Sequence, residues 1–174
     1  MNVALFGATG FSGQAVLHEL LEKGHQVTAL VRNASKLKTA HPNSFISDAT
    51  KATVEVMEQK GVRRLIAMSN VGAGDSMNFY PWYFRKLILP YFMKWLQLII
   101  DDKNKMEPFL QKSQLDWTVV RCPNIIDKPA KGKTHATLTG EGLKLSIKKA
   151  DMASFLVRQL TDNQYMHQLP SISN

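Results

Sequence analysis

The sequence contains a single cysteine, Cys122, among its 174 residues. One cysteine cannot form a disulfide within the chain, so the sequence gives no sign of an oxidising compartment. No basic segment followed by a cleavable apolar stretch precedes the first predicted strand, and we therefore expect a cytoplasmic protein. The five histidines lack both the spacing of metal ligands and cysteine partners. We predict no metal site.

The sequence also lacks a dense run of positive charge, although its formal net charge is +8. Lysines and arginines are scattered from Lys23 to Arg158, with short pairs such as Arg63-Arg64. Nucleic-acid-binding proteins usually carry a denser basic stripe or a recognisable module, so we expect no nucleic-acid partner. Most of these charges are expected on the solvated surface, and the positive excess suits a small polyanionic ligand.

No apolar stretch is both long enough and uninterrupted enough to span a bilayer. The region richest in apolar residues, 79–100, is interrupted by Arg85, Lys86, Pro90 and Lys94. We therefore predict no stable membrane insertion.

The same region is rich in aromatic residues, and three interpretations stay open. The region could be a lid that offers a flat apolar surface to an aromatic substrate. It could instead be a dimer face, or a contact with a membrane surface. In the first case Trp82 and Tyr83 are the substrate-binding residues. A helix predicted from Pro90 to Lys112 packs part of this region into the core in every case.

Length and composition favour one domain spanning residues 1–174. Hydrophobic residues make up 44% of the chain and charged residues 21%, which is ordinary for a globular protein. A chain of this size can bury a core without metals or disulfides. The sequence leaves monomer and homodimer as alternatives.

The N-terminal stretch carries the most informative motif. Val3 to Phe6 form a short apolar run without alternation, which is typical of a parallel strand buried on both faces. Gly7, Gly10 and Gly13 follow, and they allow a tight turn, close approach of a ligand and close packing of the next helix. The free N–H groups and the positive end of that helix would favour a pyrophosphate.

The context of this turn supports a dinucleotide site over a purely structural glycine turn. A helix predicted over 14–23 ends at Gly24, and a strand over 26–32 completes a βαβ unit. We therefore predict that the turn binds a dinucleotide through Gly7, Thr9, Gly10, Phe11, Ser12 and Gly13.

The end of the second strand favours NADP(H), with NAD(H) as the alternative. The residue at this place faces the adenosine ribose in a dinucleotide fold, and here it is Arg32. A guanidinium attracts a 2′-phosphate, which a carboxylate would repel. Ser35, Lys36 and Lys38 add a hydroxyl and charge nearby. The alternative for Arg32 is an exposed arginine with no ligand.

Two later strands, predicted over 63–70 and 116–122, carry polar residues to one edge of the predicted sheet. A helix over 48–59, with Ser47 as its N-cap, precedes a strand over 63–70 that ends in Ser69 and Asn70. Open α/β sheets bind ligands at the carboxyl ends of their strands, so these two residues should face a nicotinamide or a substrate. The alternative is that they only cap a loop.

Five motifs together resemble the atypical short-chain dehydrogenase/reductases, in particular the NAD(P)H-binding group that includes NmrA-like proteins and the biliverdin reductase B/flavin reductase type. They are Gly7-Ala-Thr-Gly-Phe-Ser-Gly13, Leu30-Val-Arg32, Gly61-Val-Arg-Arg-Leu-Ile66, Asp116-Trp-Thr-Val-Val-Arg121 and Lys149-Ala-Asp151. The resemblance covers nearly the whole chain. It implies a Rossmann-like, three-layer αβα sandwich with a mainly parallel, doubly wound sheet.

The resemblance also implies roles for residues after two strands. Ser69 and Asn70 occupy the place of a pair that polarises the substrate or holds the nicotinamide, and they are our catalytic candidates. The loop of Pro123, Asn124 and Ile125 would pack against the nicotinamide. Biliverdin reductase B-like proteins carry a histidine where Asn124 stands here, so an identical arrangement for biliverdin reduction is not expected.

The chain departs from the family between Pro42 and Ser47. Family members have a third strand, a helix and a fourth strand at this point, and only residues 43–46 are available here. We hypothesise that roughly 30 to 45 residues are missing, because a βαβ crossover takes about that length. The loss of the fourth strand would either leave a gap beneath the nicotinamide or bring its two neighbours into direct pairing.

No tyrosine is followed four residues later by a lysine, which is the acid–base pair of classical short-chain dehydrogenases. The resemblance places Lys103 or Lys105 nearest to the missing lysine, but we expect both on the surface. The predicted function is therefore hydride transfer from NAD(P)H to a flat conjugated acceptor, such as a flavin or quinone, which needs stacking more than a dedicated acid. The alternative is a non-catalytic, NmrA-like NADP(H) sensor that reports to a partner protein.

Overall fold

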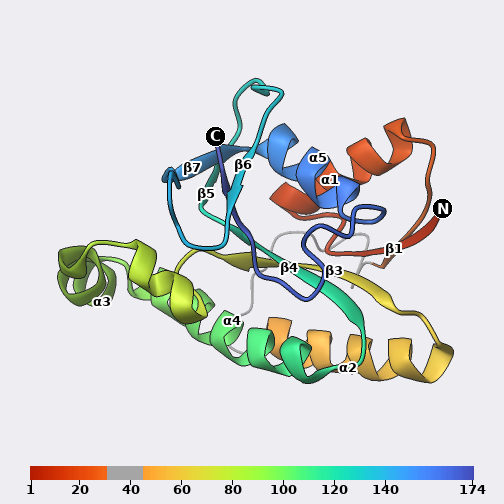
Figure 1. Cartoon of the computed structure of the whole chain (residues 1–174), viewed down its shortest axis with the longest axis horizontal. Coiled ribbons are helices and arrows are strands. Elements are labelled where there is room, and N and C mark those ends of the chain that lie inside the picture. The colour runs from red at the N-terminus through yellow and green to blue at the C-terminus, as the bar shows by residue number, and fades with distance from the viewer. Residues whose placement is uncertain (31–44) are drawn as a thin grey trace.

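The computed structural model describes residues 1–30 and 45–174, and Figure 1 shows helices and strands alternating along the chain. Two short helical segments, the 3-10 helix η1 and the π-helical turn η2, lie between β3 and α3. The elements in order are β1 (Asn2–Phe6), α1 (Phe11–Glu22), β2 (Gln26–Leu30), α2 (Phe45–Lys60), β3 (Arg64–Asn70), η1 (Gly74–Phe79), η2 (Phe84–Ile88), α3 (Leu89–Phe92), α4 (Lys94–Lys112), β4 (Asp116–Cys122), β5 (Asn124–Ile126), β6 (His135–Thr137), β7 (Ser146–Lys148), α5 (Lys149–Arg158) and β8 (Ser171–Ser173).

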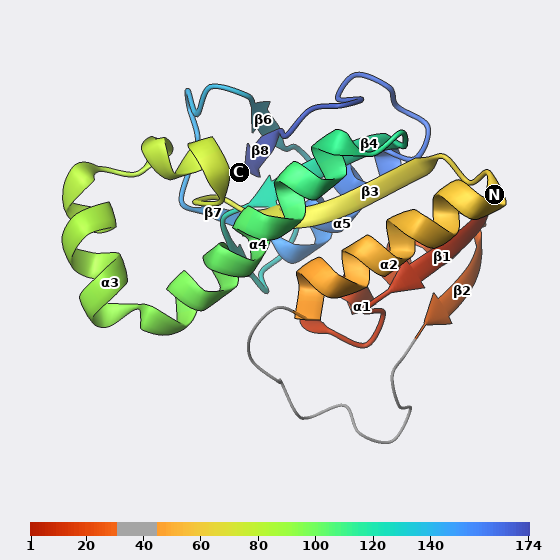
Figure 2. The ribbon, with the colours of Figure 1, turned by 90° about the horizontal axis from the view of Figure 1, so that it is seen from below.

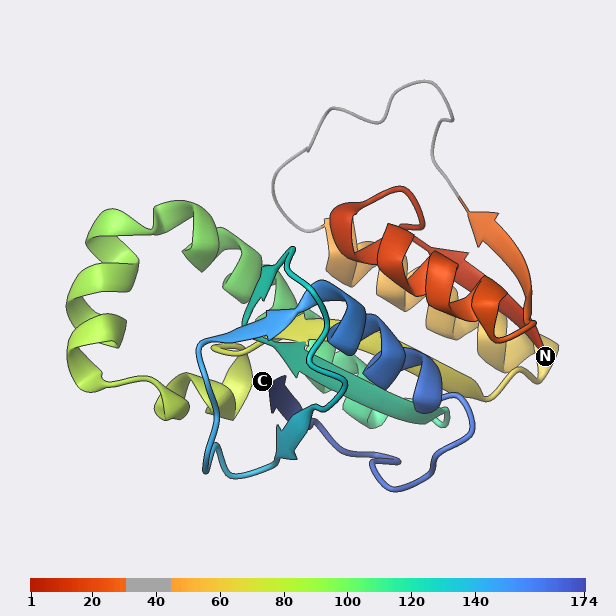
Figure 3. The ribbon, with the colours of Figure 1, turned by 90° about the horizontal axis from the view of Figure 1, so that it is seen from above.

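Helices cover both faces of the strands, as the Rossmann-like prediction requires. On one face α1 packs against α5, and both lie in front of the strands in Figure 3. On the other face α2 packs against α4, and Figure 2 shows this pair in front of β3. The predicted three-layer αβα architecture is confirmed.

Most strand pairs are parallel, but they form separate sheets. β1 pairs with β2, and β5 pairs with β7, in parallel. The remaining strands have the order β3-β4-β8-β6, in which only the β8–β6 pair is antiparallel. In the part of the chain that the structure describes, no strand joins β1 to β3. Of the two outcomes expected for the missing fourth strand, the structure therefore shows the gap and not direct pairing.

The core is divided between the two faces of β3 and β4. One cluster is centred on α5 and includes Val120, Met152 and Phe155, with Ile66 and Met68 packed against it. The other is centred on α4 and includes Met106, Leu110 and Trp117, with Leu65 and Ala67 packed against it. Successive residues of β3 thus contribute to opposite clusters, as the pleat of a strand requires.

The prediction that β1 is buried on both faces is wrong. Asn2, Ala4 and Phe6 are exposed, and Phe6 has 56% of its surface accessible. Apolar residues of a parallel strand are normally covered by helices on both faces and by neighbouring strands. β1 has a strand neighbour at only one of its edges in the described chain, so part of its apolar surface stays uncovered.

Glycine ends α1 as predicted. Gly24 adopts a left-handed φ of 72°, its N–H donates to the Leu21 carbonyl, and the His25 N–H donates to the Leu20 carbonyl. This is the Schellman arrangement, which satisfies carbonyls left free at a helix end.

The predicted helix cap at Ser47 is wrong, and Asp151 also lies inside a helix. Ser47 lies inside α2, where its hydroxyl donates to Asp102 over 2.6 Å. Asp151 lies inside α5, and its carboxylate accepts the N–H groups of Lys131 and Gly132. Both residues bind another segment of the chain, a long-range role that sequence spacing cannot show.

None of the helices in residues 1–30 and 45–174 has the length and apolar character needed to cross a membrane.

Candidate functional site

The turn between β1 and α1 is tight and packs directly on the helix. Gly7 has a left-handed φ of 72°, and its carbonyl accepts the Gly10 N–H at 3.0 Å. A Cβ atom on Gly13 would lie 1.9 Å from the Gly7 oxygen, so only glycine fits there. The turn and the first turn of α1 are therefore in direct backbone contact.

The N-terminus of α1 offers hydrogen-bond donors. Gly10 is the N-cap and provides no side-chain cap, and no acidic residue lies in the first turn. The N–H groups of Phe11, Ser12 and Gly13 precede the first donor of the helical ladder, Gln14, which bonds to Gly10. They find no acceptor among the described residues, so this end of the helix can bind an anion.

A lysine that the sequence analysis gave no site role lies beside this turn. The Lys149 ammonium is 4.6 Å from the centre of the Phe11 ring and 2.6 Å from an Asp127 carboxylate oxygen. Lys149 is the first residue of α5, which packs against α1. Its charge therefore adds to the positive end of α1. The Lys149-Ala-Asp151 motif was the signal in the sequence, but the spacing alone did not connect it to the glycine turn.

The carboxyl end of β3 holds the two catalytic candidates in different surroundings. Ser69 is 1% exposed, and its hydroxyl has no hydrogen-bond partner among the described atoms. Asn70 is half-buried, and its neighbouring position on the strand directs its side chain to the opposite face. The structure brings both residues to the predicted edge, and their catalytic role stays a prediction.

Lys103 is not a surface lysine, contrary to expectation. It is 6% exposed, and its ammonium donates to the Met68 carbonyl of β3 over 2.7 Å. Burial lowers the pKa of Lys103 from its ordinary value of 10.5 to about 8. Lys105, two residues along α4, is exposed. The structure thus distinguishes two lysines that the sequence left equivalent.

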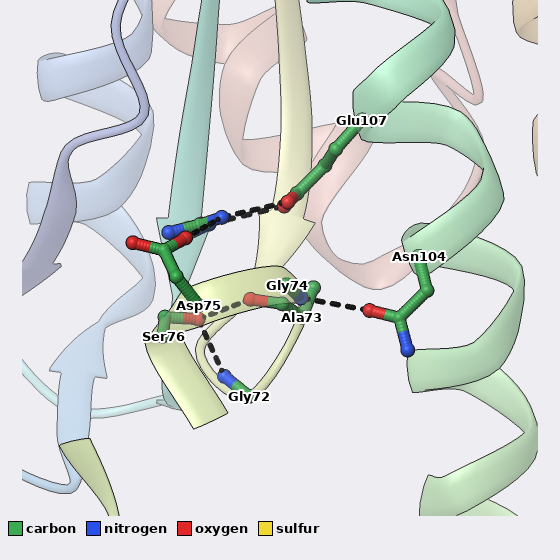
Figure 4. Close-up of polar contacts among 8 residues, drawn as sticks. Gly72, Ala73, Gly74, Asp75, Ser76, Asn104 and Glu107 are labelled. Atoms are coloured by element: carbon green, nitrogen blue, oxygen red, sulfur yellow. Dashed lines mark hydrogen bonds and ion pairs between the residues drawn. The ribbon is translucent and has the colours of Figure 1, made fainter. Parts of the chain in front are cut away.

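A hydrogen-bonded loop follows β3 (Figure 4). Ser76 accepts the Gly72 N–H at 2.9 Å and donates to the Ala73 carbonyl at 2.6 Å, and the Gly74 N–H donates to Asn104 of α4 at 2.7 Å. These bonds connect Gly72, Ala73, Gly74 and Ser76 with one another and with α4, beyond the carboxyl end of β3.

A buried ion pair supports the same loop. Arg121 of β4 binds both carboxylate oxygens of Glu107, at 3.1 and 2.7 Å, and also Asp75 at 2.7 Å. Arg121 and Glu107 are each 3% exposed, whereas Asp75 is 72% exposed. The bidentate pair joins α4 to β4 beneath the loop.

The predicted loop after β4 is in part a short strand, β5, and its contact with a nicotinamide stays a prediction. Pro123 is buried, Ile125 is half-buried and Asn124 is exposed. The Asn124 N–H donates to the Leu145 carbonyl, because this segment forms β5 and pairs with β7. The Asn124 N–H is therefore already bonded within the protein. Cys122, at the end of β4, is a buried core residue, and burial raises the pKa of its thiol to about 12.

The aromatic segment extends beyond the carboxyl ends of β3 and β4 (Figure 1). Trp82 and Tyr83 are exposed and contact each other edge to face, with ring centres 6.3 Å apart. Tyr80 and Phe84 stack at 4.6 Å, and burial raises the pKa of Tyr80. Whether this segment acts as a lid stays a prediction. Arg32 and Lys36, the predicted ribose-phosphate contacts, lie outside the described residues.

Comparison with known sequences agrees with this geometry. The model of a family described as NAD(P)H-binding matches residues 7–46 and 39–163. The Bacillus subtilis protein YwnB is 38% identical over 55 residues, which are 32% of this chain and 26% of that protein. The photosystem II assembly factor Ycf39 of Guillardia theta is 24% identical over 211 residues, covering 94% of this chain and 62% of the factor. The chain thus spans less than two thirds of these relatives.

The family match bears on the short region near Pro42, and the alignment with Ycf39 bears on the length of the chain. The family match divides into two pieces that meet at residues 39–46. The alignment with Ycf39 is 211 positions long, more than the 174 residues of this chain, so that factor carries residues with no counterpart here. The missing segment remains our hypothesis, and these observations support it.

Solved structures share the fold. A Bacillus halodurans protein assigned as an NAD-dependent epimerase/dehydratase has a TM-score of 0.79 at 20% identity, covering 100% of this chain and 94% of its own. The anaerobilin reductase ChuY of Escherichia coli O157:H7 has a TM-score of 0.77 at 20% identity, covering 99% and 97%. A Streptococcus pneumoniae protein assigned as an NADH-flavin reductase has a TM-score of 0.69 at 19% identity, covering 100% and 99%. With the family match over most of its length, the chain belongs to the NAD(P)H-binding family.

Proposed function

We propose that this protein is an NADPH-preferring reductase that passes hydride to a flat conjugated acceptor of the flavin or quinone type. The observation that carries the proposal is the turn at Gly13, where the helix and the loop are too close for any side chain and where backbone donors have no partner among the described residues. That arrangement fits the pyrophosphate of a nicotinamide dinucleotide. The bound dihydronicotinamide would supply the hydride.

Charge around the turn supports the binding of an anionic cofactor. Lys149 lies over Phe11, and α1 presents its N-terminus on the same side. Arg32 supports the preference for NADPH through the attraction between its guanidinium and a 2′-phosphate. Replacing Arg32 by alanine should raise the Kd for NADPH about tenfold and leave that for NADH nearly unchanged.

The residues at the carboxyl ends of β3 and β4 suit positioning better than acid–base chemistry. Ser69 has a buried hydroxyl without a partner, and Asn70 can donate and accept but cannot transfer a proton usefully. Lys103 is the strongest ionisable candidate near this edge, and its ammonium is held by the Met68 carbonyl. Solvent can supply the proton to a reduced flavin or quinone, so no dedicated acid is required.

Turnover with a panel of acceptors tests the proposal. NADPH and NADH are each mixed with the intact protein and with FMN, FAD or a quinone, and the loss of the reduced nicotinamide absorbance is followed. We expect protein-dependent oxidation of NADPH with at least one acceptor, and faster oxidation of NADPH than of NADH. Tight binding of NADPH without oxidation by any acceptor would contradict the reductase proposal.

One observation favours the alternative, a non-catalytic NADP(H) sensor. In residues 1–30 and 45–174 no strand joins β1 to β3, where the family's fourth strand would support the nicotinamide. A protein that binds the adenosine and pyrophosphate parts but holds the nicotinamide loosely would report cofactor levels without using them. The same panel separates the two functions, since a sensor binds NADPH and consumes none.

A further inference from the structure

Four lysines lie on β7 and on the loops next to β5 and β7. We call them the lysine cluster: Lys128, Lys131, Lys144 and Lys148. The first three are exposed, and Lys148, the last residue of β7, is half-buried. Lys148 pairs with Ile126 of β5. The cluster thus belongs to the short β5–β7 sheet and its connections.

Two buried polar side chains hold the backbone of these segments together. Asp151 is 5% exposed, and its carboxylate accepts the N–H groups of Lys131 at 2.8 Å and Gly132 at 3.0 Å. Asn174 is 8% exposed, and its side chain accepts the Lys148 N–H at 3.2 Å and donates to Asp151 at 2.6 Å. The loop after β5 is therefore fixed beside β7, and their lysines are brought together.

The carboxylates around the cluster do not neutralise its positive charge. In residues 1–30 and 45–174, no ion pair involves any of the four lysines. Asp127, next to Lys128 in the sequence, is paired with Lys149 at 2.6 Å. Desolvation lowers the pKa of Lys148, and so do the charges of the other three lysines, whereas Asp151 raises it. A group of like charges without a counter-charge attracts an anionic ligand.

The cluster lies next to the glycine turn. Lys149, which follows Lys148, is the first residue of α5, and its ammonium is 4.6 Å from the ring centre of Phe11, the first residue of α1. Figure 3 shows that α1 and α5 begin on the same side of the molecule. An anion bound by the cluster would therefore lie near the cofactor that we assign to the turn.

The position of the cluster relative to the strands favours the acceptor as the source of this anion. In a dinucleotide fold the adenosine half lies over the first βαβ unit, which here is β1, α1 and β2. β3 lies between β1 and β4 in Figures 2 and 3, and β5 follows the carboxyl end of β4. The cluster is thus on the side where the nicotinamide and the acceptor would meet. The glycine turn and Arg32 are already assigned to the cofactor phosphates.

We propose that the lysine cluster binds a doubly charged anionic group of the acceptor, such as a phosphate monoester. This inference rests on the proposed reductase function and narrows its acceptor to acidic molecules. Lysine suits the role because each ammonium carries a full charge and three donors on a flexible stem, so several lysines can converge on one phosphate.

FMN and riboflavin test the proposal, because they share the isoalloxazine ring and only FMN carries a phosphate. With saturating NADPH, we expect the KM for FMN to be at least about tenfold lower than that for riboflavin. Added salt should reduce this difference, since it screens charges on the surface. Equal KM values for the two flavins at low salt would overturn the proposal.

A double variant locates the site. Lys131→Gln combined with Lys148→Gln removes two charges and keeps the backbone hydrogen bonds of both residues. It should lower the ratio of kcat/KM for FMN to that for riboflavin at least about fivefold. Lys60→Gln combined with Lys112→Gln is the matched control, because these exposed lysines end α2 and α4, near the amino ends of β3 and β4. An equal fall of the ratio in the control would overturn the proposal.

The Kd for NADPH separates the acceptor from the cofactor as the source of the anion. The cluster variant should change this Kd by less than about twofold. A Kd for NADPH raised about tenfold, with unchanged selectivity between the flavins, would overturn the proposal, because the cluster would then bind the cofactor.

Failure of the reductase function would be seen separately, as no NADPH oxidation with either flavin. Equilibrium binding of FMN and riboflavin, followed by quenching of flavin fluorescence without NADPH, then decides the role of the cluster. Tighter binding of FMN that is lost in the cluster variant would support the proposal. Equal binding of the two flavins would overturn it.

Discussion

Gly13 has no room for a side chain, and this residue fixes the distance between α1 and the turn. A Cβ atom would lie 1.9 Å from the Gly7 oxygen, whereas a Cβ atom on Gly10 would lie 3.4 Å from it. Gly13→Ala should therefore lower the free energy of unfolding by about 1–3 kcal/mol, as overpacked sites do, and lower Tm by several degrees. Gly10→Ala is the matched control and should leave Tm nearly unchanged in thermal unfolding monitored by circular dichroism.

At Lys103 the structure predicts a specific pH dependence of stability. Burial lowers its pKa from 10.5 to about 8, so between these values the unfolded chain binds the proton and the native protein releases it. The free energy of unfolding then rises with pH through this window. Relative to Lys103→Met, which cannot titrate, the wild type should gain roughly 2 kcal/mol between about pH 7 and pH 10. Denaturant unfolding of both proteins across this range measures the difference in the free energy of unfolding. If that difference does not change with pH, the pKa of Lys103 is not lowered in the native protein.

Among the elements, the loop after β3 depends on α4 and β4 for its shape. Glu107→Gln weakens the bidentate pair and leaves Arg121 with an incompletely compensated buried charge. Removing one partner of such a pair typically costs about 3–5 kcal/mol. Asp75→Asn removes the exposed partner of the same arginine and should cost less than about 1 kcal/mol. Equal losses in urea unfolding would mean that the buried pair contributes no more than the exposed one.

The aromatic segment before α3 is the element whose role the sequence left most open. If it is a lid, replacing Trp82 and Tyr83 together by alanine should raise the KM for the acceptor more than the Kd for NADPH. Tyr91→Ala is the control, because Tyr91 is exposed in the same region. Steady-state kinetics with FMN and a separate NADPH titration measure the two effects. Unchanged flavin reduction in the double variant would count against the lid.

In the whole molecule, the parts that local pattern determines were predictable from the sequence. β4 has the bounds expected, Asp116–Cys122, because seven residues of strand-forming character lie between clear turns. The glycine turn was predictable from the sequence, since Gly7 adopts a left-handed φ and Gly13 has no room for a Cβ atom. The break in the sheet was expected as one of two outcomes, from the length of chain between β2 and α2.

Features that depend on distant segments were not predictable. Lys103 is buried and Lys105 is exposed because they lie on different sides of α4. The sequence alone did not show which side of this helix packs against the sheet. Lys149 reaches the glycine turn because α5 packs on α1, although the two helices are far apart in the sequence. β5 and β8 were missed because strands of three residues have too few positions to show a period.

Titration of NADPH into the wild-type protein and into Gly13→Ala, followed by calorimetry, tests most directly that the glycine turn is the cofactor site. The wild type should bind NADPH at a single site, and the folded Gly13→Ala protein should bind it at least about tenfold more weakly, because the added methyl displaces the turn that supplies the donors. No binding by the wild type, or the same Kd for both folded proteins, would contradict the assignment of this turn as the nicotinamide dinucleotide site.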